Sequence, residues 1–244
     1  MKLFILILVP FLWTGIAQSP DPYVILDRVD QNMLSTTKIL EGKMIVYGKR
    51  NTRTITFRSY SEGIDKSFTE YLSPAREAGT KMLKLKDNLW IYSPAADRTI
   101  QISGHMLKQS VMGSDMSYED MMEDRKLKDV YDATVTGEET VDGRDCWILE
   151  LNAIVEDVAY EKMKIWVDQQ RYVPLREELY AKSGQLLKRA VFSDVQRFGS
   201  RWYPTKINYR DVLKNGKGTD FIVTRLQLDV TIDPYIFTKA ALRR

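Results

Sequence analysis

The chain has 244 residues, and its 36 Lys and Arg against 33 Asp and Glu give a net charge of only +3. This length favours one domain, or at most two small ones, and 44% hydrophobic with 28% charged residues is the composition of an ordinary folded protein. Because so small a charge provides no basic surface, we expect no nucleic acid partner.

Two rare residue types limit the chemistry. The chain has one histidine, His105, and one cysteine, Cys146. A zinc site built from His and Cys needs three or four such ligands, one Cys cannot form an internal disulfide, and no calcium-loop motif occurs. We therefore expect no metal site and no cofactor. We also expect the Cys146 thiol to be buried and unreactive, since an apolar run follows it.

The first seventeen residues have the layout of a secretory signal peptide: Lys2, an almost wholly apolar run over residues 3–16, and then small residues. A membrane anchor is the weaker interpretation, because these fourteen residues rise only about 21 Å as a helix and Pro10 interrupts them. We expect cleavage after Ala17. Since Cys146 is the only cysteine, no lipid-attachment Cys follows, and the mature protein, residues 18–244, should be soluble and periplasmic.

The mature chain opens with the chemistry of a helix start. Asp21 suits the N-cap position and Pro22 the first helical position. Apolar residues then recur at helical spacing up to about Leu40, and Gly42 follows as a stop. We predict an amphipathic helix over residues 21–40 that covers part of the fold.

From Lys43 onward the apolar period changes to two, which predicts strands. The expected strands lie around Ile55 and Phe57, over residues 66–72, 82–86 and 89–92, around Ile100 and Ile102, over residues 131–139, 144–151, 160–168, 174–180, 186–195 and 201–211, and over a last strand with Ile222, Thr224, Leu226, Leu228, Val230 and Ile232 on one face.

About eleven to thirteen consecutive strands with short turns and no crossover helices predict an antiparallel sheet. So long a meander must curl into a barrel or half-barrel to manage its edges. Nothing marks a domain boundary, so we expect a single domain over residues 18–244, and we expect the last residues, 241–244, to fray.

The middle segment, residues 103–129, interrupts the strands and holds five of the ten methionines: Met106, Met112, Met116, Met121 and Met122. Ser117 and Asp120 have the spacing of a helix cap, so we expect one or two short helices here, interrupted near Gly113. Met-rich surfaces suit apolar partners of variable shape. The segment is interpreted either as a lid that contacts a ligand or as a plug at one end of the barrel.

Several motifs together resemble a known family by their order and spacing. They are Leu89-Trp90-Ile91-Tyr92-Ser93-Pro94, Gly113-Ser114-Asp115-Met116-Ser117-Tyr118-Glu119-Asp120, Trp166-Val167-Asp168, Val173-Pro174-Leu175-Arg176-Glu177-Glu178-Leu179-Tyr180, Trp202-Tyr203-Pro204-Thr205-Lys206-Ile207, and Ile232-Asp233-Pro234 with Phe237. Over residues 43–242 the chain resembles the outer-membrane lipoprotein-sorting proteins, in the LolA-like branch of the LolA/LolB-like superfamily.

This resemblance implies an incomplete antiparallel β-barrel, closed by an N-terminal helix and a helical lid, around an apolar cavity that holds acyl chains. The absence of a lipid-attachment Cys resembles the soluble carriers of the superfamily rather than its lipid-anchored receptors. Our candidate contacts to an acyl chain are Trp90, Tyr92, Ile100, Ile102, Met106, Met112 and Met116.

Three functions are weighed. The first is a monomeric periplasmic carrier of a lipid or acylated lipoprotein, which takes its cargo from an inner-membrane transporter and passes it to an outer-membrane acceptor. The alternative is an accessory subunit that docks on an inner-membrane lipid or drug exporter. An enzyme is disfavoured: only His105 is available as a histidine base and no G-x-S-x-G motif occurs. Adjacent carboxylates such as Glu177 and Glu178 also point to opposite faces of a strand.

Overall fold

The computed structural model describes residues 20–48, 51–123 and 125–243, so the predicted signal peptide, residues 1–17, lies outside the described residues. The strands are β1 (Thr37–Tyr47), β2 (Thr52–Glu62), β3 (Lys66–Ser73), β4 (Lys81–Leu85), β5 (Asn88–Ser93), β6 (Arg98–Ile102), β7 (Tyr131–Val141), β8 (Arg144–Ala153), β9 (Lys162–Asp168), β10 (Pro174–Tyr180), β11 (Leu186–Phe198), β12 (Arg201–Asp211) and β13 (Thr219–Leu228). Among the described residues, no helix is long and apolar enough to cross a membrane.

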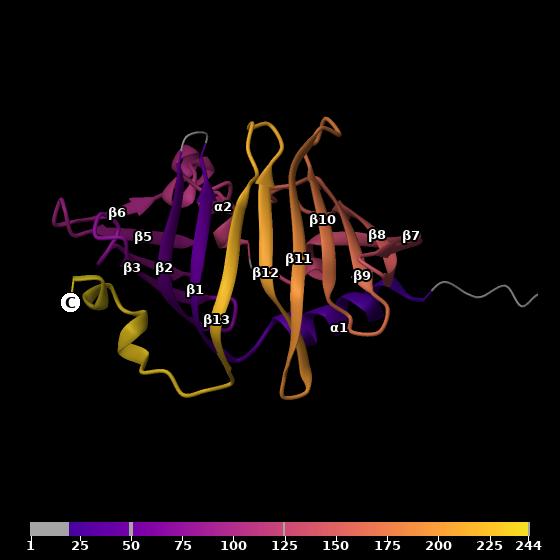
Figure 1. Ribbon diagram of the computed structural model, residues 1–244, viewed down its shortest axis with the longest axis horizontal. Helices are drawn as coiled ribbons and strands as arrows, with labels where there is room; N and C mark the ends of the chain where they lie inside the picture. Colours follow the sequence, from indigo (N-terminus) through magenta and orange to yellow (C-terminus); the bar gives the residue numbers. More distant parts are fainter. Residues whose placement is uncertain (1–19, 49–50, 124, 244) are drawn as a thin grey trace, which may run out of the picture.

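All thirteen of these strands form one antiparallel sheet in the order β6-β5-β4-β3-β2-β1-β13-β12-β11-β10-β9-β8-β7 (Figure 1). The chain starts near the middle of this sheet, runs outward to the edge strand β6, and crosses to the other edge, β7. It then returns inward until β13 pairs with β1. The predicted antiparallel meander is confirmed, and every strand expected between residues 43 and 211 is present.

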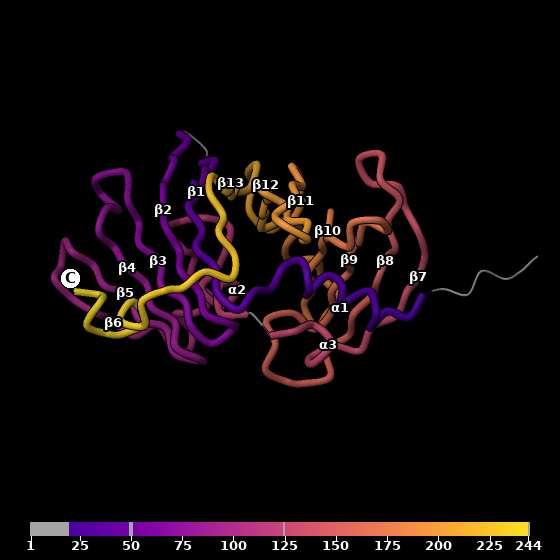
Figure 2. Tube along the Cα trace, turned by 90° about the horizontal axis from the view of Figure 1, so that it is seen from below, coloured from indigo at the N-terminus to yellow at the C-terminus, as the bar shows by residue number. Residues whose placement is uncertain are grey.

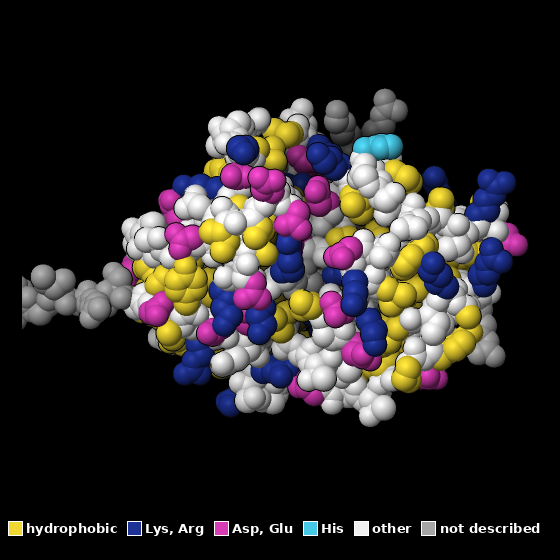
Figure 3. All heavy atoms as spheres, turned by 180° about the vertical axis from the view of Figure 1, so that it is seen from behind, with side chains coloured by type: hydrophobic (Ala, Val, Ile, Leu, Met, Phe, Trp, Pro, Cys, Tyr) yellow, Lys and Arg dark blue, Asp and Glu magenta, His cyan; other side chains and the backbone are white. Residues whose placement is uncertain are grey.

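The sheet bends into an open arch whose edge strands, β6 and β7, do not pair with each other. Figure 2 shows the helix α1 (Pro22–Met33) and the chain that joins β6 to β7 on the open side of this arch. The predicted incomplete barrel is therefore confirmed. Seen from behind, hydrophobic side chains are exposed among interspersed acidic and basic ones (Figure 3).

Residues 103–129, called the insert below, lead from one edge of the arch to the other. The insert carries the 3₁₀-helices η1 (Gly104–Lys108) and η2 (Val111–Gly113) and the helix α2 (Tyr118–Met122), and the short helix α3 (Leu127–Val130) leads into β7. The predicted cap is confirmed, because the Ser117 side chain accepts from the Asp120 backbone while the Asp120 side chain accepts from the Ser117 backbone. The expected interruption lies at Met112 and Gly113, which both have positive φ.

The predicted N-terminal helix begins as expected but is shorter. The Asp21 side chain caps α1 by accepting from the Tyr23 N–H at 2.9 Å, and the helix ends at Met33 rather than near Leu40. Residues 37–47 form β1 instead, where Leu40 lies opposite Leu226 of β13 and Ser59 of β2. Apolar residues at helical spacing continue past Met33, but pairing with two neighbouring strands satisfies the backbone of this segment on both sides and overrides that pattern.

Gly42 lies inside β1 and does not stop a helix. A Cβ at this position would lie 2.8 Å from the backbone oxygen of Ile222 and 3.1 Å from the Phe57 ring. We expect Gly42→Ala to lower the free energy of unfolding by about 1–3 kcal/mol, measured by urea denaturation. The control is Gly137→Ala in β7, where a Cβ would meet only the end of Ile148 at 3.9 Å; an equal loss in both variants would contradict the close approach at Gly42.

The last strand corrects the predicted alternation. We expected Ile222, Thr224, Leu226 and later residues on one face, but the register with β1 shifts between Glu41 and Gly42. Leu226 lies opposite Leu40 while Val223 lies opposite Gly42, so Thr224 is the extra residue of a bulge. The concave face therefore carries Phe221 and Val223 on one side of the bulge and Leu226 on the other. The strand also ends at Leu228, before Val230 and Ile232.

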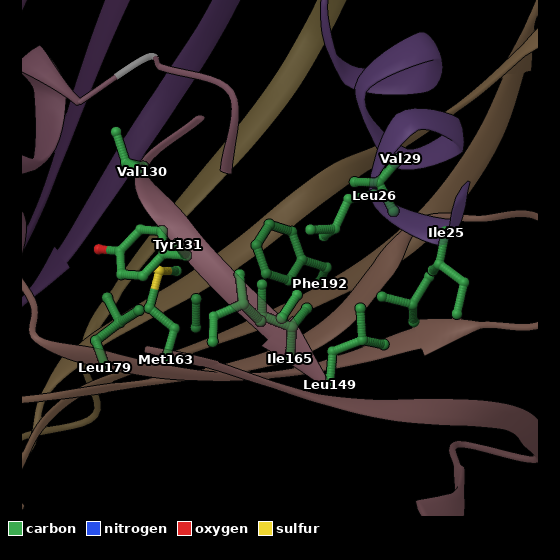
Figure 4. Close-up of a cluster of buried hydrophobic side chains, with 14 of the residues drawn as sticks. Ile25, Leu26, Val29, Val130, Tyr131, Leu149, Met163, Ile165, Leu179 and Phe192 are labelled. Carbon is green, nitrogen blue, oxygen red and sulfur yellow. The ribbon is translucent and has the colours of Figure 1, made fainter. Parts of the chain in front are cut away.

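Two buried clusters cover the concave face. In the first, Ile25, Leu26 and Val29 of α1 pack toward strand residues such as Leu149, Ile165 and Phe192 (Figure 4). In the second, Met44, Ile55, Met82 and Ile91 lie under the insert, which contributes Val111. The α1 helix and the insert thus each close one half of the arch.

Part of the convex face is also covered. The 3₁₀-helices η3 (Pro234–Phe237) and η4 (Lys239–Arg243) pack over the outside of β3, β4 and β5, and Leu242 has no exposed surface. The terminal segment up to Arg243 is therefore packed rather than frayed, which corrects the expectation. Cys146 is buried with Trp166, and this burial raises the pKa of its thiol to about 11, as expected for an unreactive cysteine.

Candidate functional site

A cavity of about 340 Å³ lies between the concave face of the sheet and the insert. This volume is within the range of small-molecule binding sites. Its walls come from β1, β2, β3, β12 and β13, and the insert contributes Val111, Met116 and Met121. Because strands from both ends of the chain meet here through the β1–β13 pairing, the cavity lies where the two halves of the arch join.

The concave faces of β1, β2 and β3, called the trough below, form one wall with a polar and an apolar end. At the polar end the strand registers place Lys38 opposite Ser61, and Ser61 opposite Ser67. At the apolar end they place Met44 opposite Ile55. In between, the Ser59 and Thr69 hydroxyls are hydrogen-bonded at 2.9 Å. The polarity therefore changes in the same direction on three adjacent strands.

Aromatic and aliphatic side chains close the apolar end of the cavity. The rings of Phe57 and Tyr71 lie 6.5 Å apart, centre to centre, and Phe221 of β13 lines the same end. From the insert, Val111 and Met121 complete the wall. An unbranched apolar chain fits such a lining, since methionine side chains adapt to irregular shapes. None of these three rings places a polar group without a hydrogen-bond partner in the lining.

The insert is held over the cavity by Arg53 of β2. Its guanidinium donates to the Met112 backbone oxygen at 2.7 Å and to the Glu77 carboxylate at 3.0 Å. Gly113 follows, and a Cβ there would lie 3.0 Å from the same guanidinium. The glycine thus permits both the positive φ and the close approach of Arg53.

Asp115 forms a second anchor of the insert. Its carboxylate accepts from the Thr219 hydroxyl at 2.8 Å and from the Asp211 backbone N–H at 3.2 Å, and its own N–H donates to the Thr219 hydroxyl at 3.1 Å. These contacts join the insert to β12 and β13. The part of the insert that contains η2 is therefore attached to β2 on one side and to β12 and β13 on the other.

The most buried anchor is Asp120 of α2. Lys188 of β11 donates to its carboxylate at 2.5 Å, and the Tyr160 hydroxyl donates to its other oxygen. Both ionic side chains are nearly enclosed, with 4% of Asp120 and 12% of Lys188 exposed. Burial opposes ionisation of Asp120, but the charge of Lys188 and these hydrogen bonds outweigh it and hold the pKa of the carboxyl below its usual range.

Comparison with known proteins gives the family of this chain. A family model described as "Uncharacterized protein" matches residues 63–244 of the chain. The chain belongs to this family. A search of curated proteins gave no match.

Solved structures with the same arch confirm the fold predicted by resemblance. An outer membrane lipoprotein-sorting protein domain from Vibrio parahaemolyticus has a TM-score of 0.80 and 24% identity, over 91% of this chain and 97% of that chain. A DUF1329 family protein from Desulfovibrio piger has a TM-score of 0.82 and 28% identity, over 91% and 100%. A LolA superfamily protein from Nitrosomonas europaea has a TM-score of 0.74 and 24% identity, over 90% and 98%. The fold is LolA-like.

The structure divides the seven candidate contacts among four places. Met116 lines the cavity. Ile102, Met106 and Met112 belong to the buried cluster that the sheet and the insert form together, and they are not among the residues that line the cavity. Ile100 shares the concave face of its strand but is 52% exposed near the edge of the arch.

Trp90 and Tyr92 lie on the convex face, which corrects their placement in the cavity. Both pack with the C-terminal segment, and the Lys239 ammonium lies 4.1 Å from the centre of the Trp90 ring. The alternation along β5 is the reason: Leu89 and Ile91 take the concave positions, so Trp90 and Tyr92, which follow them, must point outward.

Most of the cavity wall was missed by sequence reasoning. The residues concerned are Leu40, Met44, Phe57, Tyr71, Phe221 and Val223, together with Met121 of the insert. A signal for Leu40 and Met44 is the two-residue period of residues 40–46, which we began only at Lys43 because the residues up to Leu40 were interpreted as a helix with Gly42 as its stop.

Glu177 is a carboxyl group on the concave face of β10. It lies opposite Ile165 and Ala190, and in the described part of the chain it has no hydrogen-bonding or ionic partner. Burial raises its pKa to about 7. Since the folded state then binds the extra proton, the stability should fall as the pH rises from about 4.5 to about 7. We expect Glu177→Gln to remove this dependence and to be more stable than wild type by about 2–3 kcal/mol at pH 8.

The measurement is the free energy of unfolding of both proteins at pH 5 and pH 8. Asp30, whose pKa burial raises to about 6, titrates in both proteins, so the difference between them isolates Glu177. Glu178→Gln is the matched control, because the Glu178 carboxylate points the other way and accepts from Arg189 at 2.7 Å. The free energy of unfolding of the Glu178→Gln protein should fall by about 1 kcal/mol at pH 8. If Glu177→Gln lowered the stability in the same way, the raised pKa of Glu177 would be contradicted.

Proposed function

We propose that this protein is a soluble periplasmic carrier that binds the acyl chains of a lipid or lipoprotein and moves them toward the outer membrane. The observation that carries the proposal is the cavity of about 340 Å³ with an apolar end, which lies between the trough and the insert. The names of two structural neighbours, an outer membrane lipoprotein-sorting protein domain and a LolA superfamily protein, support the same class of cargo.

Such a carrier needs no catalytic group. Burial of an acyl chain contributes about 0.8 kcal/mol per CH₂, so a sixteen-carbon chain contributes on the order of 10 kcal/mol before the costs of ordering and opening. Met116 and Met121 of the insert and Phe57 and Phe221 of the sheet are the proposed first contacts. Ile102, Met106 and Met112 would support them from the adjoining buried cluster.

Cargo must enter and leave, and the insert is the proposed gate. It contributes Val111, Met116 and Met121 to the cavity wall and is fastened through polar groups at Arg53, Asp115 and Asp120. Polar anchors of this kind can exchange their partners for water when the insert moves. The insert is therefore proposed as a lid, with the sheet as its rigid frame.

The proposed route follows from the sequence. Residues 1–17 have the layout of an export signal, and the mature chain has no cysteine for lipid attachment at its start. An inner-membrane transporter would supply the cargo and an outer-membrane acceptor would receive it, while the carrier acts as a monomer.

Transfer between vesicles tests the carrier role. Donor vesicles contain a self-quenching fluorescent phospholipid and acceptor vesicles contain none, so transfer appears as a rise in fluorescence. We expect the rate to increase in proportion to the concentration of the mature protein, residues 18–244. A rate equal to that without protein, at every concentration, would contradict a carrier and favour an accessory subunit instead.

A further inference from the structure

The polar end of the trough carries a lysine, Lys38, that no acidic side chain of the described residues neutralises. Lys38 lines the cavity, and its concave position is set by its register opposite Ser61 of β2 and Leu228 of β13. Within the described residues it forms no ion pair, and its ammonium lies 5.8 Å from the centre of the Tyr203 ring. Lys66, the other lysine of the cavity lining, donates to the Glu62 carboxylate at 2.6 Å.

The surroundings of Lys38 offer hydrogen-bond donors and no competing acid. None of the described residues that line the cavity is Asp or Glu. Ser61 and Ser67 lie opposite each other across β2 and β3, and the Ser35 hydroxyl, also in the lining, is buried without a hydrogen-bond partner. A buried hydroxyl of this kind is costly unless a bound group satisfies it.

We propose that the cavity selects an amphiphile with an anionic head group, whose oxyanion binds Lys38 and the neighbouring serine hydroxyls while its acyl chain runs along the trough toward Met44. This proposal rests on the proposed function and names the ligand class of the same site. Six residues of antiparallel strand separate Lys38 from Met44, a rise of about 20 Å. The acyl chain thus runs in the direction in which the concave residues of all three strands change from polar to apolar.

The charge distinguishes two kinds of cargo. The glyceride of an acylated protein carries no charge beside its chains, whereas a fatty acid or an anionic phospholipid carries a carboxylate or a phosphate there. Hydrogen bonds to an ionised group are stronger than neutral ones, and the lysine has no acidic partner among the described residues to give up on binding. An anionic head group is therefore favoured over an uncharged one of the same chain length.

The test compares three ligands with the same palmitoyl chain: palmitate, palmitoyl-lysophosphatidylglycerol and uncharged monopalmitoylglycerol. Binding to the mature protein is measured by titration calorimetry below the critical micelle concentration of each ligand. We expect at least one anionic ligand to bind about tenfold more tightly than monopalmitoylglycerol, and Lys38→Gln to remove that preference without changing the affinity for the uncharged ligand. Lys43→Gln is the control, since it removes the same charge from the opposite face of β1.

Each outcome of this titration either supports or overturns the proposal. Preference for palmitate assigns a carboxylate head and preference for the lysophospholipid a phosphate head; either preference supports the proposal if Lys38→Gln removes it. Equal affinity for all three ligands, or an unchanged preference in the correctly folded Lys38→Gln protein, overturns the head-group assignment and leaves the carrier intact. Binding of none of the three would overturn the carrier itself.

Discussion

Lys188→Met is expected to lower the free energy of unfolding by about 3–5 kcal/mol, because it leaves the Asp120 carboxylate enclosed without its counter-charge. The carboxylate would keep the Tyr160 hydroxyl and the Ser117 cap, but neither carries a positive charge. Denaturation in urea measures the loss. Hydrogen exchange should also show that the backbone amides of α2 lose protection first, since Asp120 fastens α2 to β11.

Two comparisons make this prediction specific. Lys162→Met removes an equally short ion pair, 2.6 Å from Glu150, but 38% of that lysine is exposed, so the loss should stay below about 1 kcal/mol. The double variant Asp120→Asn with Lys188→Met should recover much of the stability, because no unpaired charge remains. Equal losses for Lys188→Met and Lys162→Met would contradict the enclosed pair as the main anchor of the insert.

Ser59→Trp should abolish acyl-chain binding, with at least a tenfold loss of affinity for palmitate or palmitoyl-lysophosphatidylglycerol. Ser59 lies midway along the trough, so an indole there would occupy the path between the polar and the apolar end. The fold should tolerate the change, since the main loss is one hydroxyl contact to Thr69, about 1 kcal/mol. Titration calorimetry gives the affinity and thermal denaturation gives the stability.

Thr54→Trp is the matched control for this substitution. Thr54 lies on the same strand, is exposed, and pairs with Ile45, on the face opposite to that of Met44. The Thr54→Trp protein should bind palmitate and palmitoyl-lysophosphatidylglycerol with the affinity of wild type. Unchanged binding in the Ser59 variant would show that the ligand does not pass through the trough.

The architecture could be predicted because strands are encoded locally. Alternation and turn residues predicted each strand between residues 43 and 211, and a meander of that length must pair antiparallel and bend. The cap at Ser117 and Asp120 was also predictable, since it depends only on residues three apart.

The cavity was harder to predict because both faces of the sheet are partly buried. The C-terminal segment covers the outside of β2, β3 and β5, so Tyr60, Phe68 and Trp90 are apolar without facing the cavity. On the inside, Ser59 and Ser61 face the cavity although their polarity is typical of a solvent face. Alternation gives the two faces of a strand but not which one encloses the site when a distant segment covers the other.

The insert shows a similar limit. Its methionines were correctly connected with the apolar interior, but only Met116 and Met121 of the five line the cavity. Which of them do so depends on three anchoring contacts, Arg53 to Met112, Thr219 to Asp115 and Lys188 to Asp120, whose partners lie 59, 104 and 68 residues apart in the sequence. Contacts over such separations leave no local pattern.

Native mass spectrometry tests the central claim most directly. The mature protein, residues 18–244, is purified without detergent from a bacterium with two membranes and sprayed under non-denaturing conditions. We predict a second species heavier by the mass of one amphiphile, which denaturation releases and which the Ser59→Trp protein lacks. A single species of the bare protein mass, unchanged after incubation with palmitate and palmitoyl-lysophosphatidylglycerol, would contradict the binding of acyl chains in this cavity.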